Sequence, residues 1–291
     1  MKRSNLRQRL EHGETVIGTM VQEVRTPAIA QILKQVGFDF LMLDMEHGAF
    51  NLETAAEIIR VARLTEIPPL VRVAGPQYEL IGRILDQGAV GVMLPRVERR
   101  GEVELLVQSI KYPPLGKRGM SSDAPHSGYN FKSLAEFVEL NNEDTIAIAQ
   151  IERKAAIENI DDILAVPGVD VALVGPEDLS VSLGLAEGDV QALVTRAIET
   201  MMAAARRHGV VSAIHMGSRT AAGLAAQGHG HGHVFVRPRL SFGGPEQGRA
   251  RAPPHRQIAK SPRPARLSPV PMGWRCDGKR LNVRIPMRFQ R

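Results

Sequence analysis

The sequence predicts an α/β protein, and within that class a (β/α)8 (TIM) barrel. From about Gly13 to Gly228, short β-branched and apolar runs alternate with amphipathic stretches. The runs are almost continuously apolar, as expected of parallel strands that are buried on both faces. Seven such units occupy about 215 residues, which favours a barrel over an open doubly wound sheet, although periodicity alone does not show closure.

Each element follows from local pattern. Apolar residues recur at three- and four-residue spacing, as in Ala55, Ile58 and Ile59, and this spacing predicts helices between the strands. The predicted strands are Val16–Met20, Phe38–Asp44, Leu70–Val73, Val90–Leu94, Thr145–Ile151, Val169–Val174 and Val210–His215. The predicted helices include Asn51–Leu64, Tyr78–Gln87, Arg100–Ile110, Ile157–Ala165 and Val190–His208.

The segment Ser121–Asn141 is expected to be a long connection after the fourth strand and its helix. Long connections in compact domains are commonly lids or binding loops, yet we interpret His126 and Tyr129 within it as surface residues. The preceding basic turn, Gly116–Gly119, is interpreted as a structural turn.

Composition excludes several classes of protein. A single cysteine, Cys276, cannot form an intramolecular disulfide framework. The charged N-terminus lacks the apolar segment of a secretory signal, and no apolar run approaches the roughly eighteen residues of a membrane span. We therefore expect a cytoplasmic protein with no membrane partner.

Charge divides the chain into two predicted parts. Residues 229–291 carry 14 Lys and Arg against 2 Asp and Glu, whereas residues 1–228 carry 23 against 29. Nine of the 19 prolines also lie in 229–291, a density that opposes helix formation. We predict a barrel domain over 1–228 and a disordered basic Pro/Arg/Gly-rich tail over 229–291, so the pI near 9.8 describes the tail and does not indicate nucleic-acid binding by the body.

The change after Gly228 is abrupt enough to suggest a frameshift, which is our hypothesis for the tail. The segment could supply one strand, Val234–Val236, but the eighth βα unit of the barrel is expected to be degraded or missing. The HGHGH run at 229–233 lacks a rigid scaffold, so we assign no metal to it.

Chemistry in a parallel barrel is expected at the C-terminal ends of the strands. Four of the predicted strand ends carry polar side chains that would converge there. They supply Asp44, Glu46 and His47 after the second strand, Arg72 on the third, Gln150 and Glu152 on the fifth, and Gly175, Pro176, Glu177 and Asp178 after the sixth.

These residue types suggest roles. Glu152 and Asp178 could ligate a hard divalent cation, and Arg72 could stabilise a carboxylate or an enolate oxygen. His47 is the natural acid/base near neutral pH, with Asp44 placed to orient it. Spacing leaves other readings open: Asp44 and Arg72 could instead form an internal ion pair, and Glu46–His47 could be a turn without a role.

Five segments together resemble the HpcH/HpaI aldolase family. They are LMLDMEHGAFNLE, PLVRV, KYPPLGKRGMSS, AQIER and VDVALVGPEDLSVSLG, in the family's order and within roughly residues 5–228. The resemblance implies a barrel that binds Mg²⁺, Mn²⁺ or Co²⁺ and cleaves 4-hydroxy-2-oxo acids to pyruvate and an aldehyde, as a class II aldehyde-lyase.

The resemblance also implies a role for each matching residue. Glu152 and Asp178 match the metal ligands, His47 matches the acid/base, and Asp44 matches its partner carboxylate. Arg72 matches the arginine beside the keto oxygen, and Gln150 matches the amide near the bound pyruvate. The pyruvate carboxylate would be held by main-chain N–H groups of the Gly175–Asp178 turn, in which Pro176 has no N–H to donate. Family members are homo-oligomers, dimer-based hexamers that exchange their last helix, but this sequence departs from the family at about His229.

Three alternatives remain beside the free-acid aldolase. One is a lyase for acyl-CoA thioesters of the citrate or malyl-CoA type, and another is an inactive truncated pseudo-enzyme. The third is a non-catalytic protein whose basic tail binds nucleic acid. The compact DMEHG and GPEDLS motifs favour the aldolase with a small 2-oxo acid substrate over the thioester lyase. The tail lacks interleaved aromatic residues and any recognised binding motif, so we expect no nucleic-acid partner.

Overall fold

The structure is a computed structural model of the 291-residue chain. It describes residues 4–121, 123–130, 133–184, 190–216, 233–237, 273–276 and 279–282. Two compact units divide the chain, residues 1–242 and 243–291.

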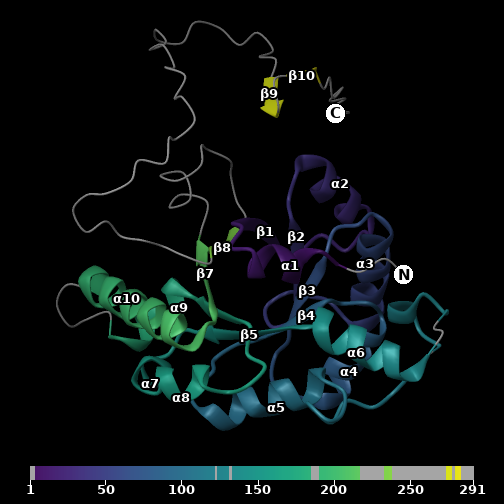
Figure 1. Cartoon of the computed structure of the whole chain (residues 1–291). Helices are drawn as coiled ribbons and strands as arrows, with labels where there is room; N and C mark the ends of the chain where they lie inside the picture. Colours follow the sequence, from purple (N-terminus) through teal and green to yellow (C-terminus); the bar gives the residue numbers. More distant parts are fainter. Residues whose placement is uncertain are drawn as a thin grey trace, which may run out of the picture. The chain divides into compact units, whose positions relative to one another are not determined.

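The first unit is a closed eight-stranded barrel (Figure 1). Neighbouring strands in sequence are neighbours in space, and the first seven are parallel. This confirms the α/β barrel and excludes the open doubly wound sheet. The strands are β1 (Val16–Val21), β2 (Phe40–Asp44), β3 (Pro69–Arg72), β4 (Gly91–Leu94), β5 (Ile146–Ile151), β6 (Val171–Val174), β7 (Val211–Met216) and β8 (His233–Arg237).

Alternation along the strands divides the core into two apolar clusters. In β2, Phe40 and Met42 belong to one cluster, while Leu41 and Leu43 belong to the other. Successive side chains of a strand point to opposite faces, so the first cluster fills the barrel and the second packs under the helices. Every residue of β2 to β6 is buried, which explains why these strands read as continuous apolar runs. At Gly18, an added Cβ would lie 2.3 Å from the Phe40 ring, so only glycine leaves room for that ring inside the barrel.

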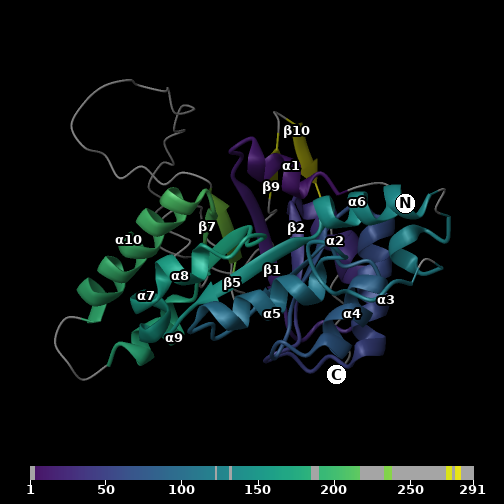
Figure 2. The same ribbon diagram turned by 60° about the horizontal axis from the view of Figure 1, so that its bottom comes forward.

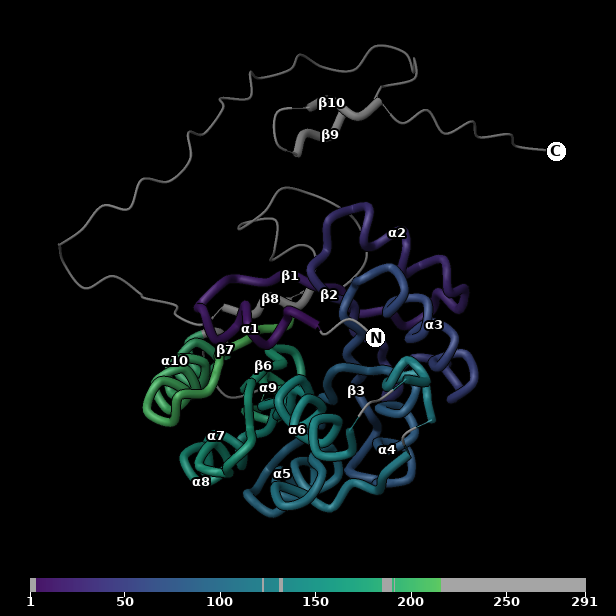
Figure 3. The backbone as a smooth tube through the Cα atoms, turned by 45° about the vertical axis from the view of Figure 1, so that its right-hand side comes forward, coloured from purple at the N-terminus to yellow at the C-terminus, as the bar shows by residue number. Residues whose placement is uncertain are grey.

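The helices form a layer around the strands (Figure 3). Going round the barrel, α2, α3, α4, α5, α8 and α10 contact one another in turn. The helices are α1 (Leu6–Glu11), α2 (Ala28–Val36), α3 (Leu52–Leu64), α4 (Tyr78–Asp86), α5 (Arg100–Ile110), η1 (Pro125–Ser127), α6 (Leu134–Asp144), α7 (Lys154–Glu158), α8 (Ile160–Leu164), α9 (Pro176–Ser182) and α10 (Val190–His208).

Helix α1 covers the end of the barrel at which the parallel strands begin. Its Leu6 and Leu10 join the cluster that fills the barrel. Arg7 donates to the carbonyl oxygen of Thr145 at 2.8 Å and pairs with Asp170 at 2.7 Å. These contacts bring α1 to the starts of β5 and β6, and α1 lies near α6 (Figure 2).

The eighth strand runs antiparallel to both of its neighbours, β7 and β1. Met216 at the end of β7 pairs with His233 at the start of β8. A parallel eighth strand would need a crossover back to the other end of the barrel, usually a helix. The predicted strand Val234–Val236 is therefore present, but it is not part of a regular βα unit; an eighth helix after it would lie outside the described residues.

Two sequence predictions are corrected in the α5–β6 region. The predicted single helix Ile157–Ala165 is two short helices, α7 and α8, separated at Asn159. The predicted connection Ser121–Asn141 contains η1 and the first part of α6. Because it lies between a helix and the start of the next strand, this segment is at the opposite end of the barrel from the strand ends that carry the predicted site.

A buried polar cluster holds this segment to α4 and α5. The side chain of His126 is only 4% exposed, so its interpretation as a surface residue is wrong, whereas Tyr129 is 66% exposed as predicted. His126 Nδ1 donates to the carbonyl oxygen of Asp86 at 3.1 Å, and its ring lies against Phe137. Arg118 is buried, pairs with Asp86 at 2.8 Å and lies over the Tyr112 ring, which supports a structural role for the basic turn.

This cluster predicts that acid weakens the fold. Burial, together with the nearby Arg118 guanidinium, lowers the pKa of His126 to about 4. The unfolded chain takes up a proton at this histidine below about pH 6.5, whereas the folded chain does so only near pH 4. The free energy of unfolding should therefore fall by about 1.4 kcal/mol per pH unit within that window.

Urea unfolding at several pH values between 7 and 4 would measure this effect. His126→Asn, which can keep the bond to the Asp86 carbonyl but does not titrate, should show a shallower dependence on pH. Parallel curves for the two proteins would contradict the assignment to His126.

The second unit contains a two-stranded antiparallel sheet of β9 (Gly273–Cys276) and β10 (Lys279–Asn282). Most of residues 229–291 lies outside the described ranges, so the predictions of a separate tail and of a frameshift remain predictions. Among the helices that are described, none has the length and apolar character needed to cross a membrane.

Candidate active site

The predicted site residues gather where the parallel strands end, and the strand periodicity explains why. Asp44 continues the barrel-facing series of Phe40 and Met42, and Arg72 follows Leu70 in the same way. Gln150 and Glu152 continue the series of β5 that begins at Ile146. Each series is apolar inside the barrel and turns polar at its C-terminal end, which places the polar groups at one mouth.

Asp44 and Arg72 form a buried, two-pronged ion pair. Arg72 Nε donates to Asp44 Oδ1 at 2.8 Å and Nη2 donates to Oδ2 at 2.5 Å. Gln22 donates to the same carboxylate at 2.6 Å. Burial alone would raise the pKa of Asp44, but the hydrogen bonds from Arg72 and Gln22 outweigh it and hold that pKa below its usual value. The alternative prediction, that Asp44 and Arg72 form an internal ion pair, is therefore confirmed.

His47 lies at the mouth, with its side chain 61% exposed. Asp44 does not contact its ring: Oδ1 accepts from the backbone N–H groups of Glu46 and His47, at 3.1 and 3.2 Å. The carboxylate beside the ring belongs to Glu46, whose Oε2 lies 3.8 Å from His47 Nε2. The prediction that Asp44 orients the histidine ring is corrected accordingly: Asp44 shapes the turn that carries His47, because its oxygens are already used by Arg72 and Gln22.

Glu152 is buried just beyond β5, among groups of both charges. Its Oε1 accepts from the backbone N–H of Arg96 at 2.7 Å, and its Oε2 accepts from Gln150 at 2.5 Å. Burial, together with the carboxylates of Asp178 and Glu46, raises the pKa of Glu152 to about 7, although the Arg96 N–H opposes the rise. A strongly shifted carboxyl group in a polar cluster is a common property of functional sites.

The turn after β6 brings the last predicted residues to Glu152. An added Cβ at Gly175 would lie 2.8 Å from Glu152 Oε2 and 3.0 Å from Gln150 Nε2, so glycine is required for this close approach. Pro176 begins α9, a position where proline is well tolerated. Glu177 and Asp178 lie in the first turn of α9 and are exposed.

The donor set fits a hard divalent cation. Glu152 is disfavoured in its charged form and has the Asp178 carboxylate as an electrostatic neighbour, so a cation between them would relieve the repulsion. Within the described residues there is no group of three or more His, Cys, Asp and Glu side chains arranged to hold a metal. Two carboxylates with water or substrate oxygens on the other positions suit Mg²⁺ or a similar ion.

Three residues at the site were not assigned a role from the sequence. Gln22 fixes Asp44. Glu46 pairs with Arg72 Nη1 at 3.3 Å and with Arg96 Nε at 3.0 Å. Arg96 follows β4 by two residues, so the same strand-end rule that selected the other four strands would have found it.

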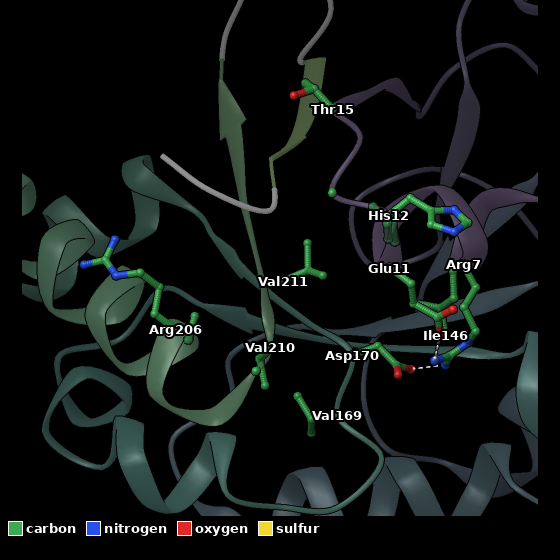
Figure 4. A pocket seen from close by; sticks show the side chains of 14 residues that line it. Arg7, Glu11, His12, Thr15, Ile146, Val169, Asp170, Arg206, Val210 and Val211 are labelled. Carbon is green, nitrogen blue, oxygen red and sulfur yellow. Dashed lines mark ion pairs between the residues drawn. The ribbon is translucent and has the colours of Figure 1, made fainter. Parts of the chain in front are cut away.

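A large pocket of about 1040 Å³ lies at the other end of the barrel (Figure 4). Its lining includes Ile146, Asp170 and Val211, which lie at or just before the starts of β5, β6 and β7. None of the predicted site residues lines it. The volume of a pocket therefore does not identify the active site of this barrel. We place the candidate site at the C-terminal mouth because charged and buried polar side chains from several strands converge there.

The fold and the site together define a barrel enzyme with its polar groups at the C-terminal ends of the strands. The sequence model of the HpcH/HpaI aldolase/citrate lyase family matches residues 20–234, and the chain belongs to this family. The family resemblance predicted from the five sequence segments is confirmed.

Two relatives and one solved structure support membership of this family. The chain is 34% identical over 206 residues to 2-dehydro-3,6-dideoxy-6-sulfogluconate aldolase of Pseudomonas putida, covering 69% of this chain and 80% of the relative. It is 34% identical over 188 residues to 5-keto-4-deoxy-D-glucarate aldolase of Escherichia coli K12, covering 65% and 73%. The crystal structure of an HpcH/HpaI aldolase from Desulfitobacterium hafniense DCB-2 superposes with a TM-score of 0.71 and 35% identity, covering 76% of this chain and 85% of the other. The relatives are aldolases, so lyase chemistry is supported at the level of the family.

Proposed function

We propose that this protein is a divalent-metal-dependent aldolase that cleaves a 4-hydroxy-2-oxo acid to pyruvate and an aldehyde. The observation that carries the proposal is the buried carboxyl group of Glu152, with its pKa raised to about 7. It lies beside Gln150, and Gln150 in turn lies beside Arg72. Membership of an aldolase family supports the same reaction.

Glu152 and Asp178 would hold Mg²⁺, Mn²⁺ or Co²⁺. When bound, the cation would supply Lewis-acid polarisation of the 2-oxo group. Gln150 holds Glu152 in place through its amide N–H, and backbone N–H groups at the start of α9, from Glu177 and Asp178, would bind the pyruvate carboxylate after the Gly175–Pro176 turn.

The proton transfers would fall to His47. Its exposed ring is accessible to a substrate at the mouth and lies beside Glu46. His47 would remove the proton of the 4-hydroxyl group as the C3–C4 bond breaks, and the bonding electrons would pass to C3 as the enolate of pyruvate. Arg72, fixed by Asp44, directs Nη1 toward Gln150 at 3.5 Å, from where it would donate to the enolate oxygen. Protonation at C3 then gives pyruvate.

The relatives suggest the kind of substrate. Both 5-keto-4-deoxy-D-glucarate and 2-dehydro-3,6-dideoxy-6-sulfogluconate, named for the relatives' activities, carry a second anionic group at the end far from the 2-oxo acid. We propose a substrate of the same class, a small 2-oxo acid with a sugar-acid or dicarboxylic-acid skeleton.

Metal removal and restoration test the proposal. Pyruvate released from a 4-hydroxy-2-oxo acid would be followed with lactate dehydrogenase as the coupling enzyme, before EDTA treatment, after it, and after addition of Mn²⁺. We expect turnover to disappear on chelation and to return with Mn²⁺, because Glu152 and Asp178 would then bind a cation.

Two controls make the result decisive. The coupling enzyme must be unaffected by the same EDTA and Mn²⁺ additions when pyruvate itself is supplied. A panel of acyl-CoA thioesters, such as malyl-CoA, tests the alternative lyase. Turnover that survives chelation, or turnover of the thioesters alone, would contradict the proposal, and folded protein without any turnover would favour the inactive pseudo-enzyme.

We also propose that the protein works on a small molecule, without nucleic acid or membrane as partner, in the cytoplasm, and as a homo-oligomer. Light scattering coupled to size-exclusion chromatography would determine the assembly.

A further inference from the structure

Arg96 is held in an unusual backbone conformation at the mouth of the barrel. It follows β4 and has φ +53°, one of three positive-φ non-glycine residues in the described part of the chain. Residues other than glycine, asparagine and aspartate rarely adopt a positive φ. The conformation directs the backbone N–H to Glu152 Oε1, at 2.7 Å, so the chain around Arg96 is fixed by the proposed metal ligand itself.

The side chain of Arg96 extends over the ends of the neighbouring strands. Its Nη2 donates to the carbonyl oxygen of Ala74, beyond β3, at 2.7 Å. Its Nε pairs with Glu46 Oε1, beyond β2, at 3.0 Å. These two contacts fix the direction of the guanidinium but use only part of its five N–H donors.

The two arginines of the site, Arg72 and Arg96, differ in the exposure of their side chains. The Arg72 side chain is 5% exposed and is engaged by Asp44 on two nitrogens, whereas that of Arg96 is 50% exposed. A planar, permanently charged guanidinium with donors open to the mouth matches the geometry of a carboxylate.

The position of Glu46 shows which part of a substrate Arg96 would meet. Glu46 Oε1 pairs with Arg96, and its Oε2 lies 3.8 Å from His47 Nε2. Arg96 and His47 therefore flank one carboxylate. Arg72, on the enolate side, contacts the same carboxylate at 3.3 Å but is buried, whereas Arg96 is exposed at the mouth. In the proposed reaction His47 acts on the 4-hydroxyl group, which belongs to the aldehyde half of the substrate, so a carboxylate at that end would be open to Arg96.

We propose that Arg96 determines specificity by binding a carboxylate at the aldehyde end of the substrate. The inference rests on the proposed function and deepens it, since it selects 4-hydroxy-2-oxo diacids over acids that have an uncharged end. Glu46 acts as a positioning residue that keeps the guanidinium over the mouth.

A matched pair of substrates tests this. 4-Hydroxy-2-oxohexanedioate and 4-hydroxy-2-oxohexanoate differ only in a carboxylate or a methyl group at C6. In Arg96→Gln we expect kcat/KM to fall roughly 10- to 100-fold for the diacid, mainly through KM, because a charged hydrogen bond is lost. For the monoacid we expect a change of less than about threefold, and Arg96→Lys should recover part of the preference for the diacid.

Arg99→Gln is the matched control. Arg99 also follows β4, but its side chain is 73% exposed and pairs with Glu102, so its loss should leave the selectivity unchanged. An equal loss of activity on both substrates in Arg96→Gln would overturn the specificity role and leave a structural one. Wild-type protein without metal-dependent pyruvate release from either substrate would instead overturn the proposed function, and the inference with it.

Discussion

Replacing Glu152 by glutamine is expected to lower kcat/KM for pyruvate release on the order of a thousand-fold, equivalent to about 4 kcal/mol of transition-state stabilisation. The amide has nearly the shape of the carboxylate but loses its charge and one of its acceptor oxygens. Both oxygens of Glu152 are already positioned, by the Arg96 N–H and by Gln150. The substitution therefore removes a ligand from the proposed metal site without opening a cavity.

The same substitution should not destabilise the metal-free protein. Burial, together with the neighbouring carboxylates, raises the pKa of Glu152 to about 7, so the ionised form that predominates at pH 8 lowers the stability of the fold relative to the unfolded chain. Thermal unfolding in EDTA at pH 8 should give a Tm for Glu152→Gln equal to or above that of the wild type, and isothermal titration should show weakened Mn²⁺ binding. Glu158→Gln, at an exposed residue of α7 paired with Lys154, is the control. Retained activity with normal Mn²⁺ affinity would contradict the role of Glu152.

Replacing Asp44 by alanine is expected to lower the free energy of unfolding by roughly 3 to 5 kcal/mol. Asp44 is completely buried and accepts hydrogen bonds from Arg72 and Gln22. Its loss leaves the Arg72 guanidinium buried with only the weaker contacts to Glu46 and Gln150. Leaving a buried charge without its partner costs far more than losing an exposed pair.

Urea unfolding of Asp44→Ala beside Glu104→Ala measures this difference. Glu104 forms a partly exposed i,i+4 pair with Arg100 at 2.6 Å, and its loss is expected to cost less than about 1 kcal/mol. Similar losses in both variants would show that the Asp44–Arg72 pair is as well solvated as a surface pair.

Much of the barrel could be predicted because its signals are local. The helices Arg100–Ile110 and Val190–His208 have the predicted bounds, since regular apolar spacing marks a face that must be buried. Helix α6 was not predicted, because only Phe137 and Asn142 are buried along its eleven residues and such a narrow face leaves little periodicity. The direction of β8 could not be predicted either, because an apolar strand reads alike in both directions.

The sequence predicts which residues come together in the site, but it does not predict which of them form hydrogen bonds or ion pairs with one another. Strand ends and the interior-facing parity bring Asp44, Arg72, Gln150 and Glu152 together. Which oxygen accepts from which donor depends on side-chain rotamers, so the sequence could not decide whether Asp44 orients His47 or holds Arg72. Arg96 follows a predicted strand and could have been selected by the strand-end rule, but its left-handed backbone conformation could not be predicted, since such positions usually carry glycine or asparagine.

The antiparallel direction of β8 has a consequence for engineering this protein. Because β8 starts at the end where β7 stops, β8 itself ends opposite the proposed site. In a regular barrel the loop after every strand can be altered to change substrate preference. Here β8 ends at the other end of the barrel, so libraries designed to change specificity should concentrate on the described chain that follows the parallel strands, beginning with Arg96 and its neighbours.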